Sequence, residues 1–175
     1  PLFWRTLAIS LQVTLLTLLI AYPAAYTIAR LPPRLARIAT VLVLVPFWVS
    51  ILVRTTAWFI LLQREGPVNA LLLAMNVIDH PLQLIFTRFA VLVAMVHVLL
   101  PFAILPMAGV MRRIDPALAR AATSLGATGL QHFRRVYLPL SLPGVGAGGL
   151  MVFMLSVGFY VTPSLVGGTG DQMVS

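Results

Sequence analysis

Long uncharged, apolar runs alternate with short arginine-bearing segments along the chain. The first run, residues 6–29, would form a helix of about 36 Å, longer than the roughly 30 Å hydrocarbon core of a bilayer. Similar runs predict further spans at about 38–62, 89–111 and 144–166. Backbone polar groups must be satisfied within lipid, and the period-two alternation of a barrel is missing. We therefore expect an all-α membrane protein, a polytopic bundle of transmembrane helices with four spans.

Composition supports a membrane protein. The chain is 60% hydrophobic and 9% charged, with a mean hydropathy of +1.00, whereas soluble domains average about 45–50% apolar and about 25% charged residues. The net charge of +8 is the balance of twelve arginines, with no lysine, against four acidic residues. In a soluble protein this would suggest nucleic acid, but basic residues also collect on the cytoplasmic loops of membrane proteins. We expect a lipid bilayer as the partner, and no nucleic acid.

The arginines predict a side of the membrane for each loop. Segments 30–37 and 112–135 lie on one side and hold eight arginines, and the other side has Arg5, Arg64 and Arg88. Under the positive-inside rule the first two segments are cytoplasmic. The loop 63–88 then faces outward, and its apolar stretch "PVNALLLAMNVI" is too short to span. We expect that stretch to be interfacial or re-entrant.

The segment 115–139 has the signals of a helical hairpin. Asp115-Pro116 starts a helix, with Asp as N-cap and Pro at the first helical position. Gly126 is placed to end that helix in a left-handed conformation. Thr128 can cap a second helix, which should stop before Pro139. The sequence thus predicts two short helices in a cytoplasmic loop.

Both hairpin helices carry an apolar stripe. The residues at helical spacing are Leu118, Ala121, Ala122 and Leu125 in the first helix, and Leu130, Phe133 and Tyr137 in the second, beside Arg134 and Arg135. Two interpretations are open from this pattern. The hairpin could rest on the membrane with its arginines facing lipid phosphates, or it could dock a cytoplasmic protein.

Residues 120–139 resemble the cytoplasmic signature of ABC importer permeases, which reads "EAA", three residues, G, nine residues, "I-x-L-P". This chain has "RAA" at 120–122, Gly126 and "VYLP" at 136–139, at the same spacing. Arg120 replaces the glutamate of the family, so the salt bridge that this glutamate makes to the partner cannot form. Val136 replaces the isoleucine.

The resemblance extends along most of the chain. The stretches "LVPFWVSILVRTTAW" (44–58), "REGPVN" (64–69), "LLPFAILPM" (99–107) and "GFYVTPSLVGG" (158–168) are similar to the spermidine/putrescine-type permeases. This family has a type I importer permease fold with about six spans, of which four would be visible here. The resemblance implies that residues 1–175 form a single permease domain and are a fragment without the first and last spans.

The resemblance also implies partners and a location, the bacterial inner membrane. The partners are a cytoplasmic ATPase dimer, a second permease subunit (the same or different) and an extracytoplasmic solute-binding protein. ATP and Mg²⁺ would bind the ATPase, and this chain would carry no cofactor. The residues expected to dock the ATPase are Leu118, Arg120, Ala121, Ala122, Leu125, Gly126, Arg134, Arg135, Leu138 and Pro139.

Two residues in the second span are candidates for the translocation path. Arg54 within an apolar run costs a few kcal/mol and marks a polar path or a pairing between helices, unless it snorkels to the outer headgroups. Trp58, one turn later, lies in the path or in the aromatic belt of the outer interface. His97 in the third span predicts an inter-helix hydrogen bond rather than a proton relay.

The resemblance adds Phe159, Tyr160 and Thr162 to the expected path. Many polyamine-type permeases carry an acidic residue at about the position of Phe159, and its absence here puts a polyamine substrate in doubt. Gly144 and Gly148 have GxxxG spacing, which predicts close helix packing.

No catalytic grouping, metal-ligand spacing or GxxxxGK[ST] phosphate loop occurs, so we expect no enzyme activity and no metal on this chain. We expect the permease subunit of an ATP-driven importer for a polyamine-like or other small organic solute. Two alternatives stay open: an ion-coupled secondary transporter using Arg54 and His97, and a structural membrane anchor or assembly subunit.

Overall fold

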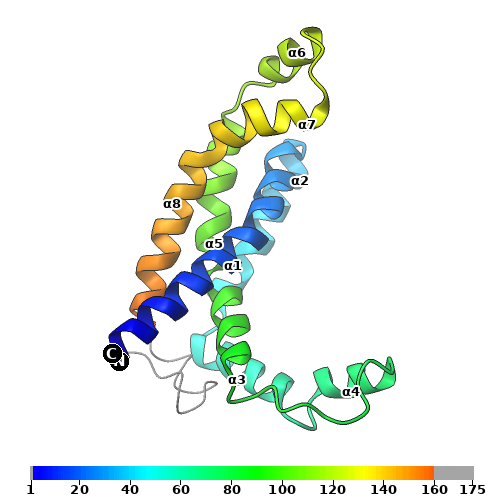
Figure 1. Cartoon of the computed structure of the whole chain (residues 1–175), viewed down its shortest axis with the longest axis vertical. Coiled ribbons are helices and arrows are strands. Elements are labelled where there is room, and N and C mark those ends of the chain that lie inside the picture. The colour runs from blue at the N-terminus through cyan, green and yellow to red at the C-terminus, as the bar shows by residue number, and fades with distance from the viewer. Residues whose placement is uncertain (1, 160–175) are drawn as a thin grey trace. The chain divides into compact units, whose positions relative to one another are not determined.

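The computed structural model describes residues 2–159, and every regular element among them is a helix (Figure 1). This confirms the all-α fold class. The elements are α1 (Leu2–Arg30), α2 (Pro33–Leu44), the 3-10 helix η1 (Val45–Trp48), α3 (Ile51–Leu62), α4 (Pro67–Ala74), α5 (Arg88–Arg112), α6 (Pro116–Ser124), α7 (Gly129–His132), the π-helix η2 (Phe133–Tyr137) and α8 (Leu138–Val157).

The chain divides into two compact units, each described below by itself. Unit 1 comprises Pro1–Thr14, Val45–Leu99 and Phe153–Ser175, and unit 2 comprises Leu15–Leu44 and Leu100–Val152. Unit 2 therefore contains the whole expected hairpin, and unit 1 contains the loop between α3 and α5.

Among residues 2–159, three helical stretches are each long and apolar enough to cross a bilayer. They are Trp4–Arg30, Arg88–Arg112 and Gly129–Val157, with mean hydropathies of 1.8, 2.4 and 1.7. The first two contain the spans expected at 6–29 and 89–111. The third begins well before the expected 144, and residues 160–166 of that expected span lie outside the described part of the chain.

The segment expected as a span at about 38–62 is interrupted in the structure. The helix α2 ends at Leu44, η1 follows, and α3 begins only at Ile51. Pro46 has no N–H to donate, and its ring clashes with the carbonyl one turn earlier, which ends an α-helix. The helical stretches Pro33–Trp48 and Ile51–Ala74 meet the length and hydropathy expected of a span only when taken together as a bent pair.

The prediction that the second hairpin helix stops before Pro139 is wrong. The helix α7 passes through η2 into α8, and the N–H of Leu138 bonds the carbonyl of Phe133, five residues back. Such a widened turn relieves the clash between a proline ring and the preceding turn. Continuing the helix also keeps its backbone groups satisfied where lipid offers no partners.

Glycines on α8 set the packing of unit 2. A Cβ added to Gly144 would lie 3.0 Å from Val110 Cβ, and one added to Gly148 would lie 3.1 Å from the carbonyl oxygen of Ala103. Both contacts are with α5, so the GxxxG prediction of close packing is confirmed. Gly149 makes the corresponding approach to α1, where an added Cβ would lie 3.1 Å from Leu18.

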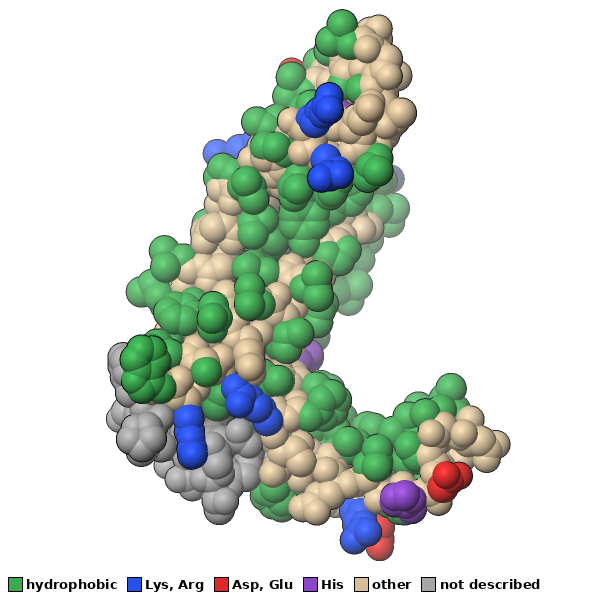
Figure 2. Space-filling view, viewed as in Figure 1, with side chains coloured by type: hydrophobic (Ala, Val, Ile, Leu, Met, Phe, Trp, Pro, Cys, Tyr) green, Lys and Arg blue, Asp and Glu red, His purple; other side chains and the backbone are tan. Residues whose placement is uncertain are grey.

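In unit 1 a buried asparagine fixes the loop between α4 and α5. Asn69 is 1% exposed. Its Nδ2 donates to the carbonyls of Gln63 (3.2 Å) and Leu82 (2.8 Å), and its Oδ1 accepts the N–H of Leu82 (3.0 Å). Figure 2 shows apolar side chains along one side of the α4 region and charged side chains on the other. This amphipathic pattern agrees with the expectation of an interfacial segment there.

Candidate functional site

The first helix of the hairpin has the predicted caps. The N–H of Ala117 donates to Asp115 Oδ1 at 2.7 Å, and Pro116 occupies the first helical position of α6. Gly126 follows the end of α6 with a φ of +80°, in the left-handed region that favours glycine. Both capping predictions are confirmed, so local signals set the length of α6.

The second helix of the hairpin begins with a capping box. The N–H of Gln131 donates to Thr128 Oγ1 at 3.3 Å, and the N–H of Thr128 donates to Gln131 Oε1 at 2.9 Å. Two N–H groups at the start of α7 are thereby satisfied. This confirms Thr128 as the cap of the second helix.

The predicted apolar stripe on α6 is uncovered. Leu125 is 88% exposed, Leu118 and Ala121 are also exposed, and Ala122 is half-buried. Within unit 2, α6 and α7 lie beyond the ends of α5 and α8 (Figure 1). A leucine held so open on a capped helix is typical of a surface that another protein covers. We call Leu118, Ala121 and Leu125 the α6 face.

The arginines of the expected docking set lie apart from the α6 face. Arg120 is exposed and sits two positions after Leu118, about 200° around the helix. Arg134 and Arg135 are exposed on η2, and none of the three forms a salt bridge within the described residues. Leu138 and Pro139 begin α8 instead of ending the hairpin.

Four aromatic residues join the hairpin to α1, and the sequence did not reveal their contact. Tyr26 of α1 lies edge-on to Phe133 and Tyr137 of η2, with ring centroids 6.1 and 5.0 Å apart. Tyr22 lies edge-on to Phe133 at 6.2 Å, and Phe133 stacks on Tyr137 at 6.1 Å. Such geometries are worth about 0.5–1.5 kcal/mol per pair beyond their burial. We call these four residues the aromatic cluster.

Two polar contacts reinforce the aromatic cluster. The guanidinium of Arg30 lies 4.1 Å from the ring centroid of Tyr26 and 5.4 Å from that of Tyr137, within cation–π range. The hydroxyl of Tyr22 shares a hydrogen bond of 2.9 Å with Ser141 Oγ of α8. A displacement of η2 would therefore act directly on the end of α1.

Trp58 and His97 form the predicted inter-helix hydrogen bond. Trp58 Nε1 of α3 donates to His97 Nδ1 of α5 at 3.1 Å, and the two rings are edge-on with centroids 5.7 Å apart. The acceptor role of Nδ1 requires a neutral imidazole with its proton on Nε2. His97 thus joins two helices of unit 1.

Arg54 satisfies backbone carbonyls at the break before α3. Its Nη2 donates to the carbonyl of Pro46 and, at 2.9 Å, to that of Val49. Both carbonyls belong to the segment where the helical hydrogen-bond ladder is interrupted, and uncompensated carbonyls are costly in lipid. The place of Arg54 and Trp58 on a translocation path stays a prediction.

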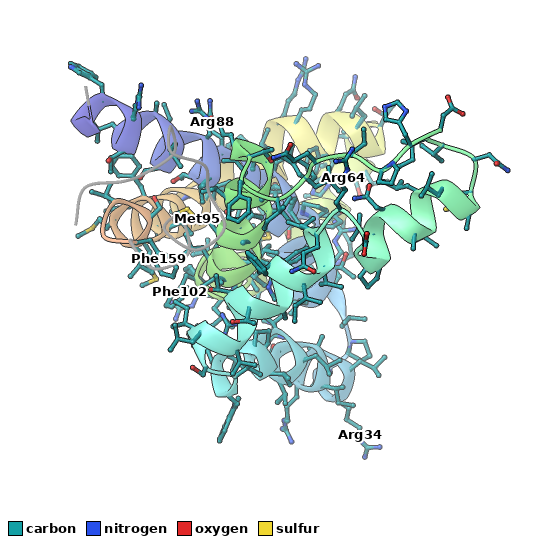
Figure 3. All side chains as sticks on the ribbon, turned by 90° about the horizontal axis from the view of Figure 1, so that it is seen from below. Arg34, Arg64, Arg88, Met95, Phe102 and Phe159 are labelled. Carbon is teal, nitrogen blue, oxygen red and sulfur yellow. The ribbon has the colours of Figure 1, made fainter. Side chains whose placement is uncertain are left out.

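Of the remaining path candidates, the structure describes Phe159 alone, two residues after the end of α8. Phe159, labelled in Figure 3, is half-buried, and its N–H bonds the carbonyl of Ser156 at 3.2 Å. Tyr160 and Thr162 lie outside the described residues. Within residues 2–159 no three His, Asp or Glu side chains gather in a way that could hold a metal ion.

A family comparison identifies the kind of chain to which this geometry belongs. The sequence profile of the family described as "Binding-protein-dependent transport system inner membrane component" matches residues 14–175. The match covers every element from α2 to α8, including the hairpin, and the C-terminal half of α1.

Individual relatives are similar along almost the whole chain. The "Spermidine/putrescine transport system permease protein PotB" of Escherichia coli is 36% identical over 99% of this chain and 65% of the relative. The protein of the same name from Haemophilus influenzae is 36% identical over 98% of this chain and 60% of the relative. The E. coli "Inner membrane ABC transporter permease protein YdcU" is 32% identical over 95% and 57%. The chain thus spans about 57–65% of the length of these relatives.

Proposed function

The chain belongs to the family of binding-protein-dependent transport system inner membrane components, and we propose that it is a membrane-spanning permease subunit of an ATP-driven ABC importer. The observation that carries this proposal is the capped hairpin with an uncovered α6 face, in a chain of this family. A membrane anchor needs no uncovered helix face that is joined to a spanning helix. An ion-coupled carrier needs no docking surface for an ATPase.

The proposed partners follow from the family. A cytoplasmic ATPase dimer binds ATP and Mg²⁺ and receives the α6 face, and a second permease subunit completes the translocation pathway. A solute-binding protein docks on the outer side, where the loop 63–88 lies. This arrangement requires segments 30–37 and 112–135 to be cytoplasmic, in keeping with their eight arginines.

The proposed mechanism uses the contacts of unit 2. Closure of the ATPase dimer moves α6, and α7 moves with it because Gly126 and Thr128 join them in a short turn. The aromatic cluster transmits this displacement from η2 to α1, and close glycine contacts hold α8 on α5. The helices change position as packed bodies, which opens the pathway to one side at a time.

The proposed solute is a small organic molecule, with polyamines as the class that the names of the relatives support. Phe159, where many polyamine-type permeases are acidic, weighs against a simple charge-based site for such a cation. Uptake of labelled spermidine in the presence of unlabelled neutral or anionic solutes tests whether the solute is a polyamine or another small organic molecule.

Transport assays separate the proposal from its two alternatives. The assembled complex in vesicles should take up solute with ATP, and uptake should persist when ion gradients are collapsed. Uptake that follows an ion gradient without ATP would indicate a secondary transporter. Partner binding with no solute flux would indicate an assembly subunit.

A further inference from the structure

A basic cavity lies where α1 and α5 of unit 2 end. It has a volume of about 520 Å³, and Arg30, Arg112 and His132 line it together with Asp115 and Tyr137. Arg30 is the last residue of α1 and Arg112 the last residue of α5. Because both helices are long enough to span, their ends lie at the level of the lipid headgroups.

The charges in this cavity are unbalanced. Asp115 is the acid that lines it, and its Oδ1 already accepts the N–H of Ala117 at 2.7 Å. Arg30 lies over the faces of Tyr26 and Tyr137, so its positive charge lies in the wall of the cavity. Arg112 is exposed and has no partner among residues 2–159. Two guanidinium groups therefore remain for an anion.

A buried hydroxyl without a partner lies in the same wall. Tyr137 is only 6% exposed, and its Oη lies near the Arg30 guanidinium but forms no hydrogen bond of normal geometry within the described chain. A buried polar group left unsatisfied costs about 1–3 kcal/mol. This hydroxyl is a donor that a phosphate oxygen in the cavity would satisfy.

A second cavity with a mixed polar and apolar lining adjoins the first. It has a volume of about 530 Å³ and shares Ala29 and Arg112 with the first. Its other lining residues come from α2 and the segment before it; they are the apolar Leu31, Pro33, Ala36 and Val41 and the polar Arg37 and Thr40. A phosphate site beside the apolar residues of this second cavity matches the two ends of a phospholipid.

We propose that these paired cavities bind an anionic phospholipid, with the headgroup phosphate between Arg30 and Arg112 and an acyl chain along α2. Basic pockets between membrane helices hold anionic headgroups in this way. Asp115 and Tyr137 line the headgroup cavity and belong to the hairpin. Bound lipid would therefore stabilise one position of the hairpin relative to α1 and α5.

The test measures lipid bound to the assembled transporter in nanodiscs. The two lipids are phosphatidylglycerol, which is anionic, and phosphatidylcholine, which is not. The variant Arg112→Gln should lower retention of phosphatidylglycerol by about tenfold, as loss of a charge-assisted contact implies. Tyr137→Phe, which changes a single hydroxyl, should lower it less. Neither variant should change the retention of phosphatidylcholine.

Arg34→Gln is the matched control. Arg34 is an exposed arginine of unit 2 that points away from α2 (Figure 3) and lines neither cavity. Its loss removes the same charge and should leave retention unchanged. Equal losses of phosphatidylglycerol retention in Arg34→Gln and Arg112→Gln, or no preference for phosphatidylglycerol in the unaltered protein, would contradict the proposed site. Displacement of the lipid by millimolar inorganic phosphate would show that the site binds free phosphate and not a lipid.

Discussion

The packing of α8 against α5 predicts that two glycines only two residues apart, Gly146 and Gly148, respond oppositely to substitution by alanine. A Cβ added to Gly148 would lie 3.1 Å from the carbonyl oxygen of Ala103 and 3.2 Å from its Cα. Both are backbone atoms, so α5 itself would have to shift. A Cβ added to Gly146, on the same helix, would meet nothing within 4 Å.

The size of the effect follows from two terms. Replacing glycine by alanine inside a helix stabilises the folded state by about 0.5–1 kcal/mol, because the unfolded backbone has less entropy to lose. Gly146→Ala should gain that amount and no more. Forcing an extra carbon into a close-packed contact costs about 1–3 kcal/mol. Gly148→Ala should therefore be less stable than Gly146→Ala by about 1–3 kcal/mol, the helix term cancelling between them.

The assay is the thermal midpoint of each purified variant, followed as the loss of the monodisperse peak in size-exclusion chromatography after heating. We expect the midpoint of Gly148→Ala to fall below that of Gly146→Ala by several degrees. A second pair gives an independent check, because Gly144 also contacts α5 while Gly109 of α5 meets nothing within 4 Å. Equal midpoints within each pair would refute the close approach of α8 to α5.

Three further predictions concern other contacts. Tyr26→Leu removes the edge-on contacts of the aromatic cluster, so solute uptake should fall several-fold while the ATPase still co-purifies; loss of co-purification would contradict the transmission role. His97→Phe should lower the thermal midpoint by the equivalent of about 1 kcal/mol through loss of the Trp58 hydrogen bond, and it should leave the pH profile of uptake unchanged, whereas a proton relay would alter it. Asn69→Ala removes the hydrogen bonds to the backbone of Gln63 and Leu82, at about 0.5–1.5 kcal/mol each, so hydrogen exchange at the Leu82 amide should accelerate; unchanged exchange would refute that anchor.

The sequence was most informative where structure is decided by near neighbours. The caps at Asp115, Gly126 and Thr128 act over two or three residues, so the sequence placed the hairpin and the turn between its helices. The spans of α1 and α5 could also be predicted from the sequence, because burial of a long apolar run in lipid depends on length and hydropathy alone.

Proline effects could not be read from the sequence, since their outcome depends on tertiary partners. Pro46 ends a helix, and Arg54 satisfies the carbonyls at the break. Pro139 leaves the helix continuous because a π-turn precedes it. The sequence shows the same residue in both places, and only the surrounding hydrogen bonds distinguish an interruption from a continuation.

The aromatic cluster was missed for a different reason. Tyr22 and Tyr26 are four residues apart on α1, as are Phe133 and Tyr137 on η2, so each pair shares a helix face. Nothing local indicates that the two faces meet, because more than a hundred residues separate them. Placement of the spanning helices beside one another is what brings them together.

The most direct test of the central claim, that α6 leaves the membrane to meet an ATPase, is labelling of single cysteines. The chain has no cysteine of its own, so Leu125→Cys and His80→Cys each offer one thiol at an exposed position. In spheroplasts a membrane-impermeant maleimide should label His80→Cys and leave Leu125→Cys unlabelled. In inverted vesicles Leu125→Cys should react only once the ATPase has been removed. Labelling of Leu125→Cys from outside, or at equal rates with and without the ATPase, would contradict the account.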